Sequence, residues 1–340
     1  MPDLIIMPGK MKAALLYGLN DLRVEEVDRP TIGSGDVVVK VKVCGVCPTD
    51  IRKYRTANHG VAKFPFNMGH EWVGDVVEVG ENTKGYAVGA RVAGMSYGGY
   101  AEYNKVNKED FDQFAPHPEI LLMPIPDDVS YDAATFYEPL ADCFHAVVTQ
   151  AQVVVGDTVL VIGAGQMGLQ LLMVSKSVGA KVIISDVLND RLKLADQLGA
   201  DMTVNVREED LKKRLMAFTN GRLVDAVITS VSQSAVIAQA LGVVRKRGRV
   251  VIFGGAPEGT VIQIDPNVIH YNEVSLVGSE WVGVGGFLDA RMCDVALEMI
   301  RSGKIPVERL ISHKYPLDRI HEAIETVERM SGTKCLITIP

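Results

Sequence analysis

Residues able to bind a metal or to act in redox chemistry are concentrated in the first half of the 340-residue chain. Cys44 and Cys47 form a Cys-x-x-Cys pair, and the run Gly69-His70-Glu71 follows. A third candidate, Glu138, precedes a proline. Such a cysteine pair is typical of a redox dithiol or of half a zinc site. No βαβ pattern surrounds this pair and no second pair completes four ligands, so the two thiols are not expected to act together. Taken singly, each residue also fits a structural role.

A glycine-rich run, Gly163-Ala164-Gly165-Gln166-Met167-Gly168, could hold the phosphates of a dinucleotide. It follows an apolar strand and opens a helix, and Asp186 stands 18 residues after its last glycine. In that context the three glycines allow a tight turn, close approach of the backbone to the pyrophosphate, and close packing of helix and strand. Asp186 can accept hydrogen bonds from both ribose hydroxyls and would repel a 2′-phosphate. The run predicts NAD in preference to NADP, and a purely structural turn is the alternative.

The segments that must position these residues change in character along the chain. Val37–Val43 and Trp72–Val79 are rich in β-branched residues, which predicts β structure in the first third. From about Asp157, apolar strands alternate with helical segments, the pattern of βαβ units around a parallel sheet. The sequence therefore predicts an α/β protein with a doubly wound sheet of five strands and four helices. The strands are expected at 158–162, 181–186, 224–229, 249–253 and 274–277, the helices at 166–178, 190–198, 208–218 and 234–244, and further helices at 289–302 and 320–330 precede a strand at 335–339.

Composition and charge exclude several classes of protein. The net charge is -7 without long charged runs, so no basic surface is expected for nucleic acid. No apolar stretch reaches the roughly 18 residues that span a bilayer. Met1–Lys12 lacks the features of a signal peptide, and five cysteines suit reduced thiols or a metal ligand better than disulfides. A cytoplasmic location, without membrane or nucleic-acid partners, is the expectation.

The motifs together resemble those of the zinc-dependent medium-chain dehydrogenase/reductase family, the group of alcohol, sorbitol and threonine dehydrogenases. The run Gly45–Asp50 and the run around His70 stand in the family's order before the glycine turn, with 23 residues from Cys47 to His70. The resemblance covers almost the full length and is closest to the sorbitol dehydrogenase branch. It implies a GroES-like, β-rich catalytic domain over residues 1–152 and 282–340, and a NAD-binding Rossmann domain over residues 153–281.

The resemblance also implies a ligand set for one catalytic zinc ion. Cys47 and His70 would be ligands, Glu138 would occupy the third ligand position, and Cys44 would be a bystander. Glu71 would either ligate the metal or stand just behind it.

Further roles follow from the same resemblance. Asp50 would orient a ligand. Zinc would act as a Lewis acid toward the alcohol, Thr49 would pass the proton outward, and hydride would move between the substrate carbon and the nicotinamide. Arg191 and Lys334 would contact the cofactor, Lys334 at the pyrophosphate. For Lys334, a solvated surface lysine is the alternative.

The sequence departs from the family in several places. Arg52 occupies the position of a histidine that continues the proton relay; it could serve a cofactor ribose, an anionic substrate group or only the surface. The four-cysteine lobe expected between Arg91 and Tyr100 is missing, so one zinc per chain is predicted. Asn104 to Leu122 is unusually polar and could form a local excursion. Glu280 and Trp281 stand where sorbitol dehydrogenases place residues for a polyol, and they leave polyols and amino alcohols open.

The predicted function is zinc- and NAD-dependent oxidation of a secondary alcohol, in particular a polyol or sugar alcohol, to the ketone. The alternatives are an amino-alcohol (threonine-type) 3-dehydrogenase, a zinc-free quinone or enoyl reductase, and a non-catalytic NAD-binding sensor. The expected partners are a small alcohol substrate and further copies of the chain, since family members pair edge strands into homodimers and homotetramers.

Overall fold

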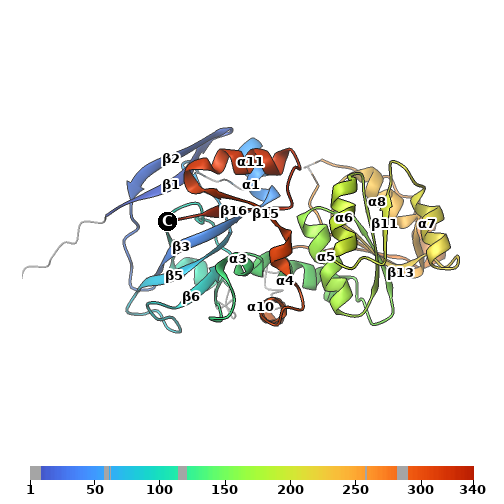
Figure 1. The fold of residues 1–340 in the computed structure, drawn as a ribbon, viewed down its shortest axis with the longest axis horizontal. Coiled ribbons are helices and arrows are strands. Elements are labelled where there is room, and N and C mark those ends of the chain that lie inside the picture. The colour runs from blue at the N-terminus through green and yellow to red at the C-terminus, as the bar shows by residue number, and fades with distance from the viewer. Residues whose placement is uncertain (1–8, 57–60, 62, 114–120, 257–258, 282–289) are drawn as a thin grey trace, which may run out of the picture. The chain divides into compact units, whose positions relative to one another are not determined.

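The computed structural model describes residues 9–56, 61, 63–113, 121–256, 259–281 and 290–340. They form two compact units (Figure 1). The first unit runs to Glu138 and includes residues 297–301 and 306–340, and the second comprises residues 139–296 and 302–305. None of the described helices is long and apolar enough to cross a membrane.

The first unit is built on two sheets. Strands β2, β1 and β4 form the smaller, and the larger has the order β15-β16-β3-β5-β6-β8, with β7 also paired to β3. The strands are β1 (Lys10–Gly18), β2 (Asp21–Asp28), β3 (Val37–Val46), β4 (Phe66–Asn67), β5 (Glu71–Val79), β6 (Arg91–Gly94), β7 (Tyr103–Val106), β8 (Leu122–Pro124), β15 (Ile311–Pro316) and β16 (Lys334–Thr338). The helices near them are α1 (Pro48–Arg55), α2 (Lys108–Gln113), α3 (Tyr131–Ala134), α4 (Tyr137–Phe144), η3 (Val307–Leu310), η4 (Leu317–Arg319) and α11 (Ile320–Glu328).

Strand β3 is the centre of the larger sheet. Its β-branched residues are largely buried, which agrees with the β structure predicted from them. It pairs antiparallel with β5 on one side and β16 on the other. Gly45 is opposite Glu71 of β5 and opposite Leu336 of β16. The first residues of β5 and β16, Glu71 and Lys334, therefore lie at the same end of β3.

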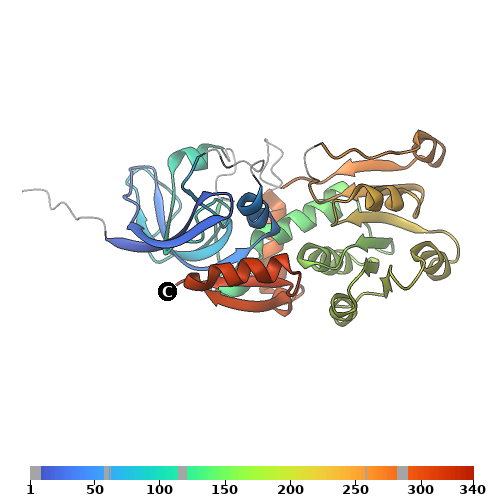
Figure 2. The ribbon, with the colours of Figure 1, turned by 90° about the horizontal axis from the view of Figure 1, so that it is seen from above.

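The second unit contains a six-stranded, all-parallel sheet of order β11-β10-β9-β12-β13-β14. Helices α5, α6, α7, α8 and α9 pack against its strands (Figure 2). The strands are β9 (Thr158–Ile162), β10 (Lys181–Asp186), β11 (Met202–Asn205), β12 (Val224–Thr229), β13 (Val244–Ile252) and β14 (Ser275–Gly278). The helices are η2 (His145–Gln150), α5 (Gln166–Ser177), α6 (Asn189–Gln197), α7 (Leu211–Phe218), α8 (Ser234–Leu241), α9 (Pro266–Asn272) and α10 (Ala290–Arg301), of which residues 297–301 belong to the first unit.

This order is that of a doubly wound dinucleotide-binding sheet, in which ligands lie where the strand order reverses, here between β9 and β12. The predicted fold class is confirmed, with corrections to the element count. Strand β11 and helix α9 were not predicted. The β11 segment, Met-Thr-Val-Asn, is short and half polar, so its strand pattern is weak. Helix α7 begins at Leu211 instead of residue 208, because the Asp210 carboxylate caps it by accepting from Lys213 N.

Candidate functional site

Cys47 is positioned by the start of helix α1. Its Sγ accepts a hydrogen bond from Thr49 N at 3.5 Å, and the Asp50 carboxylate accepts one from Cys47 N at 3.1 Å. These reciprocal bonds form a capping box, with a thiol in place of the usual hydroxyl, and Pro48 begins the helix. The local sequence therefore fixes the thiol at the amino end of a helix, where the macrodipole favours negative charge.

Asp50 connects the two segments that carry the candidate ligands. It is fully buried, and besides Cys47 N it accepts hydrogen bonds from Tyr100 OH at 2.9 Å and from Gly69 N at 3.2 Å. Its Oδ1 lies 3.4 Å from His70 Nδ1. Gly69 has φ of +78°, and a Cβ there would lie 2.8 Å from the Tyr100 ring. Glycine is required at this position, and the turn it allows delivers His70 to Asp50.

Cys47, His70 and Glu71 form a compact group of potential metal ligands. One ligand atom from each lies within 4.8 Å of the others. His70 and Glu71 are buried, and the Asp50 carboxylate lies 3.4 Å from His70 Nδ1. Among the described residues Glu71 Oε1 finds no hydrogen-bond partner. Buried polar atoms are rarely left without partners, so this oxygen calls for a ligand that is not part of the chain. A thiol, an imidazole and a carboxylate at this spacing match the donor types that bind zinc.

The acid–base properties of the group reflect burial and mutual charge. Burial raises the pKa of the Cys47 thiol. Burial alone would lower the pKa of His70, but the Asp50 carboxylate and Cys47 raise it well above its usual value. In the metal-free protein both groups therefore retain protons strongly, and a metal ion must displace those protons to bind.

Glu71 is also one partner of a buried ion pair with Lys334. The Lys334 side chain is fully buried, and its ammonium lies 5.0 Å from the centre of the Phe136 ring. The surface-lysine alternative for Lys334 is therefore wrong. The partner that the structure gives this ammonium is the Glu71 carboxylate, which is a different anion from the pyrophosphate predicted for it. A Cβ on Gly45 would lie 2.3 Å from Glu71 Oε2 and 2.7 Å from Lys334 Nζ, so the pair occupies space that only glycine leaves.

Glu138, the predicted third ligand, is the second residue of α4 and is buried. Burial raises the pKa of Glu138 to about 7, and the charges of His70, Glu71 and Lys334 also act on it. Glu138 thus lies within electrostatic range of the cluster, although the tight group of ligand atoms includes Glu71 and not Glu138. The first unit offers two carboxylates for one ligand position.

The segment that replaces the missing cysteine lobe contributes a residue that the sequence did not single out. The ring of Tyr97 meets the ring of His70 edge to face at a centroid distance of 5.3 Å. Burial raises the pKa of Tyr97 to about 12, so the phenol is neutral at physiological pH. An aromatic residue within the glycine-rich run of residues 94–99 was the only signal, and it did not indicate a contact with His70.

In the second unit, the three glycines of the turn between β9 and α5 have the conformation and surroundings that a dinucleotide-binding turn requires. Gly163 has φ of +99°, a region that favours glycine. A Cβ on Gly168 would lie 1.8 Å from the Gly163 carbonyl oxygen, so helix and turn could not pack as they do. A Cβ on Gly165 would meet nothing closer than Arg191 Nη1 at 3.6 Å, which leaves the backbone open on that side.

The remaining residues predicted to bind the cofactor surround this turn. The Asp186 carboxylate accepts hydrogen bonds from the backbone amides of Ala164, Val187 and Leu188, at 2.6, 2.7 and 2.9 Å. A carboxylate has about four acceptor positions, so these amides leave it some acceptor capacity, and the hydrogen bonds to the ribose hydroxyls stay a prediction. Among the described residues, Gln166 Nε2 is buried without a hydrogen-bond partner, and Met167 is half-buried.

Other residues singled out from the sequence lie apart from these clusters or at their edges. Thr49 and Arg52 are half-buried on α1. Pro48, the first residue of the helix, separates Thr49 from Cys47. Glu280 and Trp281 directly precede residues 282–289, which lie outside the described residues. Of the polar Asn104–Leu122 segment, residues 114–120 also lie outside the described part, and α2 accounts for much of the rest.

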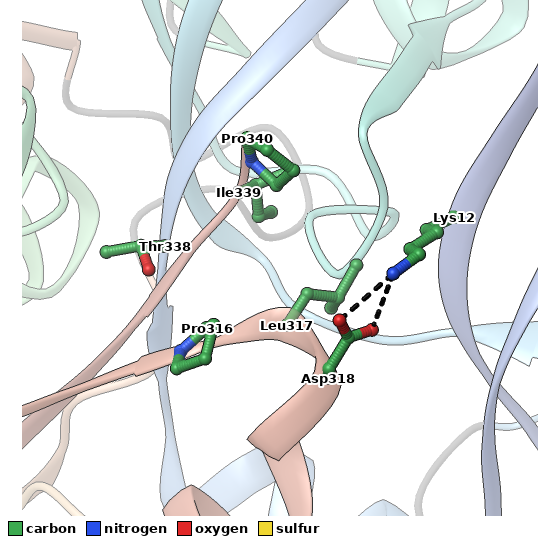
Figure 3. Close-up of a pocket in the computed structure, with 7 residues that line it drawn as sticks. All are labelled: Lys12, Pro316, Leu317, Asp318, Thr338, Ile339 and Pro340. Atoms are coloured by element: carbon green, nitrogen blue, oxygen red, sulfur yellow. Dashed lines mark hydrogen bonds and ion pairs between the residues drawn. The ribbon is translucent and has the colours of Figure 1, made fainter.

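A separate surface pocket of about 240 Å³ lies beside β15 and β16 (Figure 3). Its charged groups, Lys12 and Asp318, pair with each other at 3.0 Å. Its carboxylate, Asp318, is already paired with Lys12, and no cysteine or histidine lines the pocket, so it offers no chemistry comparable to the cluster around Cys47.

Comparison with known proteins matches two different family models to two parts of the chain. Residues 33–118 match the alcohol dehydrogenase GroES-like domain, and residues 165–299 match the family described as zinc-binding dehydrogenase. A sorbitol dehydrogenase of Halalkalibacterium halodurans is 30% identical, with 95% of this chain and 97% of the relative covered. An erythritol/L-threitol dehydrogenase of Mycolicibacterium smegmatis is 29% identical, with 94% and 95% covered.

A solved structure extends the likeness to three dimensions. The crystal structure of 2R,3R-butanediol dehydrogenase from Bacillus subtilis is 27% identical and superposes with a TM-score of 0.83 over 96% of this chain and 99% of that one. The family predicted from the sequence and its two-part fold are confirmed. With a thiol, an imidazole and a carboxylate gathered at the end of β3, and relatives matched over nearly its full length, the chain belongs to the zinc-dependent medium-chain dehydrogenase family.

Proposed function

We propose that this protein oxidises a secondary alcohol of the polyol or sugar-alcohol class to the ketone, reversibly, with one zinc ion and NAD. The observation that carries the proposal is the Cys47–His70–Glu71 group, whose ligand atoms lie within 4.8 Å of one another. The Glu71 oxygen that has no hydrogen-bond partner among the described residues fits a bound cation. The relatives named above act on sorbitol, on erythritol or threitol, and on butanediol, all of which are alcohols with several hydroxyls.

Cys47 and His70 would hold the zinc ion, with Glu71 or Glu138 as the third protein ligand. When bound, zinc supplies Lewis-acid chemistry, which stabilises negative charge on the substrate oxygen. Asp50 acts through the ligands: its hydrogen bond from Cys47 N and its position 3.4 Å from His70 Nδ1 fix how both ligands are presented.

Thr49 is the residue we assign to proton transfer. Its amide donates a hydrogen bond to Cys47 Sγ, so its backbone is fixed beside a candidate ligand, and its side chain is half-buried. A hydroxyl in this place can accept the proton of the alcohol while donating its own outward. Arg52 cannot take a proton at neutral pH, so water would complete the relay.

The second unit would bind NAD. The turn residues Gly163 to Gly168 present backbone amides at the start of α5 to the pyrophosphate, and the open side of Gly165 gives the backbone access to it. Arg191, whose Nη1 lies near Gly165, would add positive charge there. Asp186 would accept a ribose hydroxyl and repel a 2′-phosphate. In this proposal residues 1–152 and 282–340 are the catalytic domain and residues 153–281 the NAD-binding domain.

The deciding experiment is a screen of hydride transfer with zinc-loaded and chelator-treated protein. Polyols, simple secondary alcohols and amino alcohols are each offered with NAD or NADP, and NADH or NADPH absorbance is recorded. We expect turnover with polyols and NAD that disappears with the metal and returns with zinc. Full activity without zinc would favour the zinc-free reductase alternative, and NAD binding without turnover on any alcohol would favour the sensor alternative.

Two isosteric variants separate the candidate third ligands. Glu71→Gln and Glu138→Gln each remove one carboxylate while keeping its shape, and zinc content is then measured under a common zinc-buffered condition. The variant of the true ligand should lose bound zinc, whereas the other should retain it. Retention in both would contradict a carboxylate ligand.

We also propose that the protein is a cytoplasmic homodimer or homotetramer. Strand β14 is at an edge of the six-stranded sheet and could pair with the same strand of a second copy. All five cysteines are free thiols, as a reducing compartment requires. Sedimentation of the purified protein and fractionation of cells test the two statements; a monomer or a secreted protein would overturn them.

A further inference from the structure

The phenol of Tyr100 is a fully buried group beside the metal-ligand cluster, and the proposed function does not use it. Its exposed fraction is 0%. Its hydroxyl donates a hydrogen bond to Asp50 Oδ2 at 2.9 Å and lies 3.4 Å from the carbonyl oxygen of Gly45. A hydroxyl has one proton to donate, so the shorter contact takes it. The buried phenol is therefore committed to the carboxylate that faces the His70 imidazole.

Among the described residues, each oxygen of the Asp50 carboxylate has two neighbours that can donate to it. Oδ2 accepts from Cys47 N at 3.1 Å and from Tyr100 OH. Oδ1 accepts from Gly69 N at 3.2 Å and lies 3.4 Å from His70 Nδ1. These neighbours match the roughly four acceptor positions of a carboxylate. Tyr100 is thus the side chain that holds the carboxylate by the oxygen that does not face His70.

Tyr100 also contacts the turn that carries His70. Its amide donates a hydrogen bond to the carbonyl oxygen of Met68 at 3.3 Å. A Cβ on Gly69 would lie 2.8 Å from the Tyr100 ring, so the ring packs directly on this turn. Tyr100 therefore connects two segments that carry candidate ligands: helix α1, through Asp50, and the turn before β5, through its ring and its backbone.

We propose that Tyr100 is a positioning residue of the zinc site. By donating to Asp50, its phenol fixes the carboxylate that orients the His70 imidazole, and so sets how long and in what geometry the metal is held. This inference rests on the zinc site of the proposed function and deepens it. Groups that act on a metal through its ligands are commonly worth about 10–100-fold in metal affinity. Tyr100 acts one step behind Asp50, so the lower end of that range is expected.

Tyr100→Phe tests the hydrogen bond, because it removes the hydroxyl and keeps the ring that packs on Gly69. Zinc release from the loaded protein to an excess of a chromophoric chelator is timed. The cobalt-substituted protein is compared by absorption spectroscopy, which reports the geometry of the ligands. We expect zinc release about tenfold faster than from wild type, and cobalt bands that differ from those of wild type. With saturating zinc, kcat for the alcohol should fall while KM for NAD changes little.

Tyr131→Phe is the matched control. Tyr131 lies in the same unit, and its hydroxyl donates to the Asp75 carboxylate, which is outside the ligand group. The variant loses a hydrogen bond of the same kind, and it should keep the zinc-release rate and the cobalt spectrum of wild type. Urea unfolding of both variants without metal separates a loss of zinc from a loss of folded protein.

A double variant tests whether Tyr100 acts through Asp50. In an Asp50→Asn background the carboxylate that the phenol orients is already gone, so Tyr100→Phe should change zinc release little further. If the two substitutions instead multiplied their separate effects on the release rate, Tyr100 would act on the metal by another route, and the inference would be overturned.

The remaining outcomes distinguish this inference from the proposed function. Equal zinc release and equal cobalt bands in Tyr100→Phe and Tyr131→Phe would overturn the inference alone, since the phenol would then only fill space. If Tyr100→Phe does not fold, wild-type zinc release from Asp50→Asn would overturn it, and faster release would support it. A wild-type protein that binds no zinc would overturn both. Zinc binding without turnover of any alcohol would count against the proposed function only, because release rates and cobalt bands still test Tyr100.

Discussion

The cluster at the end of β3 and the glycine turn after β9 are two binding sites built on opposite principles. The cluster is made of Cys47 at the start of α1, His70 and Glu71 at the start of β5, and Lys334 at the start of β16, which pairs with Glu71. These segments are distant in sequence, and the pairing of β3 with β5 and β16 brings the last two together. The turn is made of backbone from six consecutive residues, and side chains matter there chiefly by their absence. A side-chain site should therefore be sensitive to the loss of a group, and a backbone site to the addition of one.

The largest effect is expected from removing a ligand. Cys47→Ala deletes a predicted zinc ligand, so zinc content and turnover should both collapse, with a rate loss of about 10³-fold or more, corresponding to several kcal/mol of lost transition-state stabilisation. Metal analysis and steady-state rates measure the two effects. NADH affinity should stay within a few-fold, because the turn does not depend on the cluster.

Cys44→Ala is the matched control, since Cys44 is a fully buried thiol three residues earlier that is not in the ligand group. It should keep its zinc. If both variants lost zinc equally, the two cysteines would be acting as a pair, contrary to the sequence interpretation.

The next largest effect should come from the buried ion pair. Lys334→Met leaves the Glu71 carboxylate buried without its partner, which should lower the free energy of unfolding by about 3–5 kcal/mol in metal-free protein. Urea denaturation of the variant and wild type measures the difference. The double variant Lys334→Met/Glu71→Gln removes the uncompensated charge and should recover much of the loss. A loss below about 1 kcal/mol in the single variant would mean that water reaches Glu71 once the lysine is gone.

The turn should respond to a single added methyl group. Gly168→Ala places a Cβ 1.8 Å from the Gly163 carbonyl oxygen, and relief of that clash should cost about 1–3 kcal/mol and displace the amides that face the pyrophosphate. NADH affinity should fall by about tenfold or more while zinc content remains normal. Gly165→Ala is the control for stability, because a Cβ there has space. Unchanged NADH binding in Gly168→Ala would contradict the assignment of the turn.

The smallest effect is expected at Asp186, whose carboxylate already accepts three backbone amides. Asp186→Asn keeps an acceptor but removes the charge that repels a 2′-phosphate. The ratio of NAD to NADP affinity should therefore fall by roughly tenfold, the value of one charged hydrogen bond. Isothermal titration with both cofactors measures it, and an unchanged ratio would place the discrimination elsewhere.

The same contrast explains what could be predicted from the sequence. The turn was predictable because its residues are consecutive and each glycine is needed for the geometry of the turn itself. The strands around it also have clear apolar periodicity. The family resemblance brought Cys47, His70, Glu71 and Glu138 together, although their proximity depends on long-range pairing. The contacts of Tyr97 and Lys334 were not predictable, because nothing within a few residues of either indicates where its side chain lies. Strand β11 was missed for lack of apolar residues, since it is defined by its pairing with β10.

Gly45 has a consequence for how this site can change over evolutionary time. Because a Cβ there would meet both Glu71 and Lys334, the three positions cannot be substituted independently. A larger residue at position 45 becomes acceptable only after one member of the ion pair has been shortened, and a shortened pair leaves a void that a larger residue at position 45 would then fill. In descendants of this chain the three residues should therefore be inherited or replaced as a set, and the first step away from glycine should pass through a less stable intermediate.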